Sequence, residues 1–445
     1  MPAKRANVRF FSTPAAAQEA GFRACMRCRP DAAPGAPDWS HGADIAARAM
    51  RLIADGVVDR EGVPGLARAL AFSERQLHRI LVRELGAGPL QLARVERVRA
   101  ARLLIEATQL PFVDVAASAG FSSVRQFNQT IRQFTGATPT ELRNAPAARA
   151  QAGARPDQLT VRLEYRQPLH FIGVVRQLAR EAIPGVQEVR DETIRVAMSL
   201  PHGPAVAALD DGGAWIRCRL RLADLRDLSA AIQRCRRLLD LDADPEAVDS
   251  TLRLDPLLGP LVRAAPGRRV VGCVDGWELL ARLIVTWGLP GAAQRAAVAR
   301  LVAELGSPLP FATPGVQALF PTAAAVTEGD PERLAAQSRR AALLQSVAEL
   351  VAAGELNVHA GADRDELEAA LHAVPGMPAE LPVVVRMRAL GDPDAFPDLD
   401  PALSARSRGW RPWRAYAAQH LWDLRSNALM PSSVSRIGPR SPLTR

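Results

Sequence analysis

The chain has 445 residues, of which 48% are hydrophobic and 23% charged, which is typical of a globular protein with several domains. It contains no run of eighteen apolar residues and no apolar stretch behind its charged start, which excludes a membrane span and a signal peptide and predicts a cytoplasmic location. The net charge is +9, and residues 1–150 carry +8 of it, with 21 Lys and Arg against 13 Asp and Glu. This asymmetry favours a polyanion partner for the first third of the chain, although an arginine-rich composition with Lys4 as the single lysine is an alternative cause.

Residues 1–39 are predicted to form a short irregular segment that ends in a proline-rich linker. Within it, residues 7–11 and 20–30 resemble the second half of the Ada-type methyl-acceptor domain, in which four cysteines hold a zinc ion. The resemblance implies that Cys25 and Cys28 are zinc ligands. Two cysteines do not complete a tetrahedral site, so we expect a truncated domain without methyl-acceptor activity, unless a further cysteine pair lies upstream of Met1.

Residues 40–145 are predicted to be almost entirely helical and to contain two helix-turn-helix units. In the first unit, a short helix ends near Phe72, Ser73 caps a second helix, and Gln76 completes a capping box. The apolar residues of this second helix fall on one stripe and are expected to be buried: Leu77, Ile80, Leu81 and Leu85. Arginine and glutamine suit the hydrogen-bonding edges of guanine and adenine, and such residues occupy the opposite face: Arg75, Gln76, Arg79 and Arg83.

The second unit, residues 113–136, repeats this plan. Ser123 and Gln126 have capping-box spacing, and the expected core residues are Phe127, Ile131 and Phe134. The expected DNA-contacting residues are Arg125, Gln126, Gln129 and Arg132. A helix over residues 90–105 is predicted to join the units, so that both recognition helices enter successive major grooves of double-stranded DNA. The whole of residues 42–143 resembles the AraC/XylS-type DNA-binding domain; the alternative is a plain helical bundle with solvated arginines.

After a small-residue linker at 146–157, residues 158–227 alternate apolar and polar side chains, which predicts a small antiparallel α+β domain with a turn at 210–213. Residues 228–425 are predicted to be helical, and residues 426–445 to be a disordered tail. Several stretches of this half resemble the AlkA-type 3-methyladenine DNA glycosylases: residues 238–245, 255–258, 319–321, 371–376, 388–397 and 410–422. The resemblance implies a small α+β domain followed by a helix-hairpin-helix bundle.

Such glycosylases flip a damaged base out of the duplex and cleave its bond to the sugar. The resemblance implies that Asp400 is the carboxylate that stabilises the cationic transition state and that Trp422 stacks on the base. Asp400 also precedes Pro401, so an ordinary helix N-cap is the alternative role. Because no lysine follows Lys4, a lysine Schiff base is excluded, and water must be the attacking group.

The hairpin departs from the family pattern of Pro-Gly-Ile-Gly followed by an aromatic residue. Gly376 is present, but Pro378 replaces the second glycine and removes a backbone donor for a DNA phosphate. Glu380 replaces the aromatic residue, and Val384 stands where a tyrosine is common. Each lost stacking partner is expected to cost about 1–3 kcal/mol.

The sequence therefore predicts an alkylation-damage response protein, in which a DNA-binding regulator is fused to a monofunctional DNA N-glycosylase. The alternative is a transcriptional regulator with a catalytically degenerate glycosylase-fold domain. The operator, the preferred lesion and the oligomeric state are left open.

Overall fold

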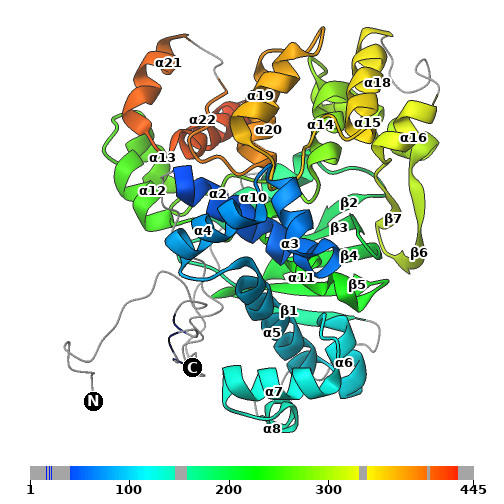
Figure 1. Ribbon diagram of the computed structural model, residues 1–445. Helices are drawn as coiled ribbons and strands as arrows, with labels where there is room; N and C mark the ends of the chain where they lie inside the picture. The colour runs from blue at the N-terminus through cyan, green and yellow to red at the C-terminus, as the bar shows by residue number, and fades with distance from the viewer. Residues whose placement is uncertain are drawn as a thin grey trace, which may run out of the picture.

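The computed structural model describes residues 41–145, 158–329, 338–397 and 401–428, together with positions 17, 20 and 22. The expected fold class is confirmed, because a helical region, an antiparallel sheet and a helical bundle follow one another along the chain (Figure 1). The two predicted linkers at 30–39 and 146–157 lie outside the described residues, and so does the predicted disordered tail at 426–445 except for residues 426–428, which are helical and not disordered as expected. Among the described helices, none combines the length and the apolar character needed to cross a bilayer.

The first region consists of helices with short connections: α2 (His41–Ala54), α3 (Val57–Ala69), α4 (Glu74–Leu85), α5 (Pro89–Ala107), α6 (Phe112–Ser118), α7 (Val124–Thr135) and α8 (Pro139–Asn144). The predicted connecting helix is α5, which starts with a proline at its first turn, where no N–H partner is needed. Helices α4 and α7 lie at its two ends (Figure 1). The apolar stripe of α4 faces the core as expected: Leu77 and Leu81 are fully inaccessible, whereas Ile80 and Leu85 are only half-buried.

The second region is a five-stranded antiparallel sheet in the order β1-β5-β4-β3-β2. Its strands are β1 (Leu159–Glu164), β2 (Gln187–Arg190), β3 (Thr193–Leu200), β4 (Gly203–Asp211) and β5 (Trp215–Leu222). The predicted alternation is confirmed, because Ile216, Cys218 and Leu220 of β5 are fully buried. Their face packs against α10 (Phe171–Arg180) and α11 (Leu228–Leu238). The turn is shorter than expected, since β4 extends to Asp211 and pairs there with Ile216.

The third region is a helical bundle that continues from the short η2 (Leu225–Asp227) and α11. Its helices are α12 (Pro245–Leu252), α13 (Leu258–Ala264), α14 (Gly276–Thr286), α15 (Gly291–Leu305), α16 (Ala323–Glu328), α18 (Ser338–Ala352), α19 (Arg364–Ala373), α20 (Glu380–Ala389), α21 (Pro401–Ser407), η3 (Arg408–Trp410) and α22 (Arg414–Ala428).

One part of this bundle was expected to be helical and is not. Strands β6 (Ser307–Thr313) and β7 (Val316–Leu319) form a hairpin there. Pro308 and Pro310 disfavour a helix at this point. Gly315 has a φ of +75°, a left-handed conformation that glycine adopts easily and that suits the tight turn of the hairpin. The hairpin joins the bundle to the sheet region, because the backbone N–H groups of residues 317 and 318 both donate to the carbonyl of Gly185.

The helix-turn-helix region packs against the rest of the molecule. A single hydrophobic cluster includes Leu104 of α5, Phe127 of α7 and Val161 of β1. Helix α2 contacts α11, and α5 contacts β1 (Figure 1). The two halves of the chain therefore share a core, in addition to being connected through residues 146–157.

Candidate DNA-binding and base-excision sites

Serine caps fix the start of both recognition helices. Ser73 Oγ accepts from the Gln76 N–H at 3.3 Å, and Gln76 Oε1 accepts from the Ser73 N–H at 3.2 Å, which is the predicted capping box. At α7, Ser123 Oγ accepts from the Gln126 N–H at 3.2 Å. The side chain of Gln126 accepts instead from Ser122 Oγ at 2.8 Å, so this cap is not reciprocal. Both caps leave the helix N-termini at the surface, where they favour a phosphate.

All the side chains expected to contact DNA are exposed: Arg75, Gln76, Arg79, Arg83, Arg125, Gln126, Gln129 and Arg132. The amide oxygens of Gln76 and Gln126 accept hydrogen bonds from serine hydroxyls in this structure. For these two glutamines, the amide N–H group is therefore the part available to an acceptor on a base. Contact of these residues with DNA stays a prediction.

Arginines of α5, which the sequence did not single out, hold the two units in place. Arg97 Nε donates to Asp59 Oδ1 of α3 at 2.5 Å. Arg94 lies over the Phe134 ring at 5.3 Å and donates to Gln133 Oε1 of α7 at 2.9 Å. These contacts connect α3 and α7 to α5.

The predicted hairpin lies between α19 and α20. Gly376 is exposed and has a φ of +83°, a conformation that favours glycine. Pro378 does not disrupt the turn, because its carbonyl accepts from the Leu381 N–H at 3.1 Å. Glu380 begins α20 and is half-buried, as is Val384 one turn later. The hairpin backbone is thus present, and its side chains depart from the family pattern as the sequence indicated.

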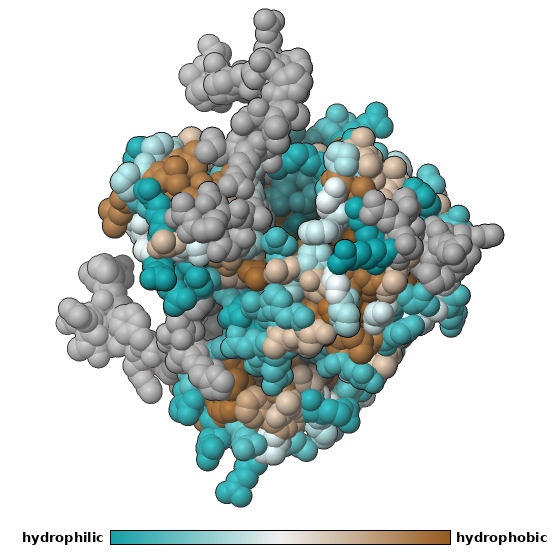
Figure 2. Space-filling view, turned by 90° about the horizontal axis from the view of Figure 1, so that it is seen from above, coloured by the Kyte–Doolittle hydropathy of each residue, from teal (hydrophilic) through white to brown (hydrophobic). Residues whose placement is uncertain are grey.

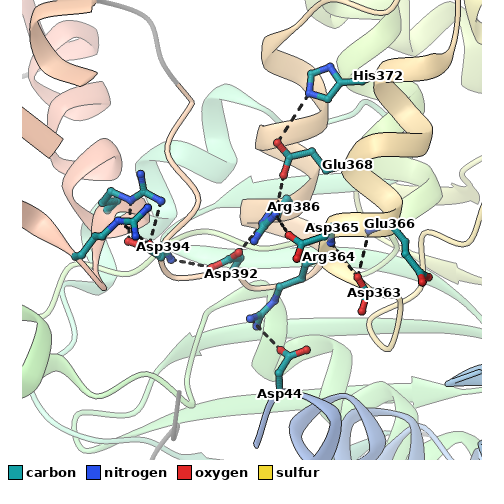
Figure 3. Close-up of polar contacts among 12 residues, drawn as sticks. Asp44, Asp363, Arg364, Asp365, Glu366, Glu368, His372, Arg386, Asp392 and Asp394 are labelled. Atoms are coloured by element: carbon teal, nitrogen blue, oxygen red, sulfur yellow. Dashed lines mark hydrogen bonds and ion pairs between the residues drawn. The ribbon is translucent and has the colours of Figure 1, made fainter. Parts of the chain in front are cut away.

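Two aspartates that the sequence did not single out anchor the loop before Asp400 (Figure 3). Asp392 is buried, and Arg386 Nε of α20 donates to its Oδ2 at 2.6 Å. Asp394 accepts two bonds from Arg414 of α22, at 2.8 and 2.9 Å. A bidentate arginine–carboxylate pair fixes orientation as well as distance. A signal for this pair was present in the sequence, because both residues lie in stretches that resemble the glycosylase family.

The helix after Asp400 is anchored too. Helix α21 begins at Pro401, while Asp400 itself lies outside the described residues. Asp255 accepts from Arg406 at 2.9 and 3.0 Å and from the Trp410 indole at 2.8 Å. Burial alone would raise the pKa of Asp255, but these donors outweigh it and hold the pKa well below its usual range. The lowered pKa favours the charged carboxylate, which is the form that pairs with Arg406.

Trp422, the predicted stacking residue, lies on α22. It is half-buried and packs against a cluster that includes Trp410, Trp413 and Tyr416. The side of the molecule that is uppermost in Figure 1 is hollowed, and hydrophilic residues line the hollow (Figure 2). Helices α18, α19 and α21 reach this side, which is therefore the candidate face for a DNA duplex.

The structure does not test the predicted metal ligands. Cys25 and Cys28 lie outside the described residues. Within the described ranges, no group of three or more His, Cys, Asp or Glu side chains is arranged to hold a metal ion.

Three family models match the chain. Residues 160–275 match the AlkA N-terminal domain, residues 66–145 match a helix-turn-helix domain, and residues 1–31 match the metal binding domain of Ada. A probable bifunctional transcriptional activator/DNA repair enzyme AlkA of Mycobacterium tuberculosis is 46% identical over 433 residues, which cover 94% of this chain and 87% of the relative. The chain belongs to this family.

Two further matches cover only part of this chain. DNA-3-methyladenine glycosylase 2 of Escherichia coli is 26% identical over 278 residues, which cover 58% of this chain and 95% of that protein. The solved structure of a 3-methyladenine DNA glycosylase from Archaeoglobus fulgidus has a TM-score of 0.52 and 17% identity, and the match covers 61% of this chain and all of that one. This structural likeness shows that the second half of the chain has the glycosylase fold.

Proposed function

We propose that this chain is an alkylation-damage response protein in which residues 40–145 bind duplex DNA sequence-specifically and regulate transcription. Residues 158–227 and 228–425 together form a monofunctional DNA N-glycosylase that removes alkylated purines of the 3-methyladenine type. The observation that carries the proposal is that described residues on both sides of Asp400 are held by ion pairs, Asp394 by Arg414 and Arg406 of α21 by Asp255. A carboxylate that must lie beside a sugar needs such rigid flanks. The cytoplasm, where chromosomal DNA lies, is the proposed location.

The proposed reaction starts from a base that is flipped out of the duplex. Trp422 stacks on the alkylated purine, whose positive charge favours an aromatic face. The bond between the purine and C1′ of the sugar breaks, and its electrons neutralise the charge of the leaving base. The carboxylate of Asp400 stabilises the cation that develops on the sugar and orients a water molecule. Water adds to C1′ and releases a proton, which leaves an abasic site and an unbroken strand.

The hairpin favours one alternative, a transcriptional regulator whose glycosylase-fold domain is catalytically degenerate. Pro378 offers no N–H to a phosphate, and Glu380 places a carboxylate at the start of α20, on the hairpin itself. A negative charge at this point repels the DNA backbone.

For the N-terminal segment we propose only that Cys25 and Cys28 are the remnant of an incomplete zinc site in a truncated methyl-acceptor domain. Residues 1–31 supply these two cysteines and no histidine, which is half of a tetrahedral set. No step of the proposed reaction depends on this metal.

Base release from methylated duplex DNA tests the proposal. The purified chain is incubated with such DNA, and free 3-methyladenine is measured by chromatography. Asp400→Asn should abolish release, while Asp398→Asn, two residues earlier in the same segment, should retain it. Duplex binding without release by the unmodified chain would support the non-enzymatic alternative, and equal release by both variants would refute the role of Asp400.

A further inference from the structure

Helix α2 of the regulator half reaches the loop that leads into the first hairpin helix of the glycosylase half. Arg48 of α2 is buried, with 5% of its surface exposed. Its Nε donates to the carbonyl of Gly361 at 2.8 Å, and its terminal nitrogen pairs with Asp363 at 2.7 Å. These partners are more than 300 positions away in sequence. A buried guanidinium group is tolerated only when it is well bonded, so this contact is a specific one.

The neighbouring turn of α2 repeats the contact. Arg51 Nε donates to the carbonyl of Ala360 at 2.6 Å, and burial at this interface lowers the pKa of Arg51 to about 9. Leu52 packs directly on Gly361, where an added Cβ would come within 2.5 Å of the leucine Cγ. The loop at 360–361 is therefore held through its backbone carbonyls and fits closely against α2.

The same contacts fix the start of α19. Asp363, the partner of Arg48, caps this helix by accepting from the N–H groups of Asp365 at 3.0 Å and Glu366 at 3.2 Å. The next residue, Arg364, pairs with Asp44 of α2 at 3.0 Å (Figure 3). Because α2 holds the start of α19 and the hairpin at Gly376 follows its end, the position of the hairpin depends on α2.

A second set of contacts continues from α19 toward the catalytic segment. Arg386 of α20 reaches Glu368 of α19 at 2.8 Å and Asp392 at 2.6 Å, and it also pairs with Asp365 (Figure 3). Helices α19 and α20 and the loop before Asp400 are thus connected side chain to side chain. A displacement at the start of α19 should therefore also shift α20 and the loop that contains Asp392.

We propose that α2 is a positioning element of the glycosylase, and that Arg48 and Arg51 of the regulator half place the hairpin for lesion-containing DNA. This inference rests on the proposed glycosylase function. It predicts that the second half of the chain is not an independent enzyme but needs a helix contributed by the first half.

The test uses the full chain carrying both Arg48→Met and Arg51→Met. The matched control is Arg68→Met, which removes an exposed arginine of the same region that pairs only at the surface with Glu61. Hydrogen exchange of residues 364–379 should become at least tenfold faster in the double variant and stay unchanged in the control. On methylated duplex DNA without an operator, KM should rise at least fivefold with kcat changed less than twofold.

A charge exchange keeps the test decisive if the double variant unfolds. Asp44→Arg and Arg364→Asp should each speed exchange in residues 364–379, and the two together should restore slow exchange. Two results would overturn the proposal. One is a wild-type hydrogen-exchange rate and KM in the Arg48→Met/Arg51→Met variant. The other is hydrogen exchange that stays fast when Asp44→Arg and Arg364→Asp are combined. If the unmodified chain releases no base, the proposed function fails, while hydrogen exchange still decides whether α2 holds the hairpin.

Discussion

The bidentate contact between Arg414 and Asp394 yields a quantitative prediction for catalysis. Both side chains are 22% exposed, and two hydrogen bonds join them at 2.8 and 2.9 Å. Hydrogen bonds to charged groups contribute about 1.5–3 kcal/mol each when buried, and partial exposure reduces this, so we assign the pair about 2 kcal/mol. If Arg414→Met abolishes this stabilisation of the productive loop conformation before Asp400, the activation free energy of base release rises by about 2 kcal/mol. Base release should then slow about thirtyfold.

Single-turnover release of 3-methyladenine from methylated duplex DNA measures this effect without a contribution from product dissociation. Arg411→Met is the matched control, because Arg411 contacts the same aspartate at 3.5 Å and is 63% exposed. An exposed pair contributes about 0–1 kcal/mol, so this variant should slow release by at most about fivefold. Equal rates for the two variants, or a wild-type rate for Arg414→Met, would refute the idea that Asp394 positions the catalytic segment.

Three further predictions concern stability and DNA binding. Burial raises the pKa of Glu278 to about 7, so the stability that this group contributes is lost as pH rises from about 4.5 to about 7. Between pH 5 and pH 8 the wild-type chain should therefore lose about 2.5 kcal/mol of unfolding free energy through this group, measured in urea titrations, and Glu278→Gln should lack this loss. Unchanged pH dependence in the variant would contradict this. Phe127 is fully buried and meets Phe121 edge to face at 5.6 Å, so Phe127→Ala should destabilise the helix-turn-helix region by about 3–5 kcal/mol in thermal unfolding. Arg79→Ala and Arg132→Ala should each weaken operator binding by about 1–3 kcal/mol in gel-shift titrations while leaving base release unchanged. If both the operator affinity and the sequence preference stay at wild-type values, these residues do not contact the operator.

Local features of the chain were predictable because they depend on residues close together in sequence. The spacing of Leu77 and Leu81 marks one side of a helix, and Ser73 with Gln76 marks its start. The alternation through Ile216, Cys218 and Leu220 identifies a strand with one buried face. The β6–β7 hairpin was missed although Pro308 and Pro310 signalled it, because the surrounding sequence has a helical pattern.

The catalytic side of the molecule was predictable only in outline. The resemblance pointed to Asp400 and Trp422, whereas the aspartates that hold the segment in place, Asp392 and Asp394, have no periodic or capping pattern of their own. Their roles depend on Arg386 and Arg414, which come from two other helices.

Apart from the β6–β7 hairpin, the sequence by itself determined where the main helices and strands lie, which of their faces are buried, and that two DNA-binding folds lie in one chain. Only the tertiary structure decided that these folds share an interface, through Arg48 and Arg51 of α2. An arginine on a helix is usually solvated, and nothing within a few residues of Arg48 marks it as buried. Its environment is created by a loop more than 300 positions later, so it exists only once both halves have folded and packed.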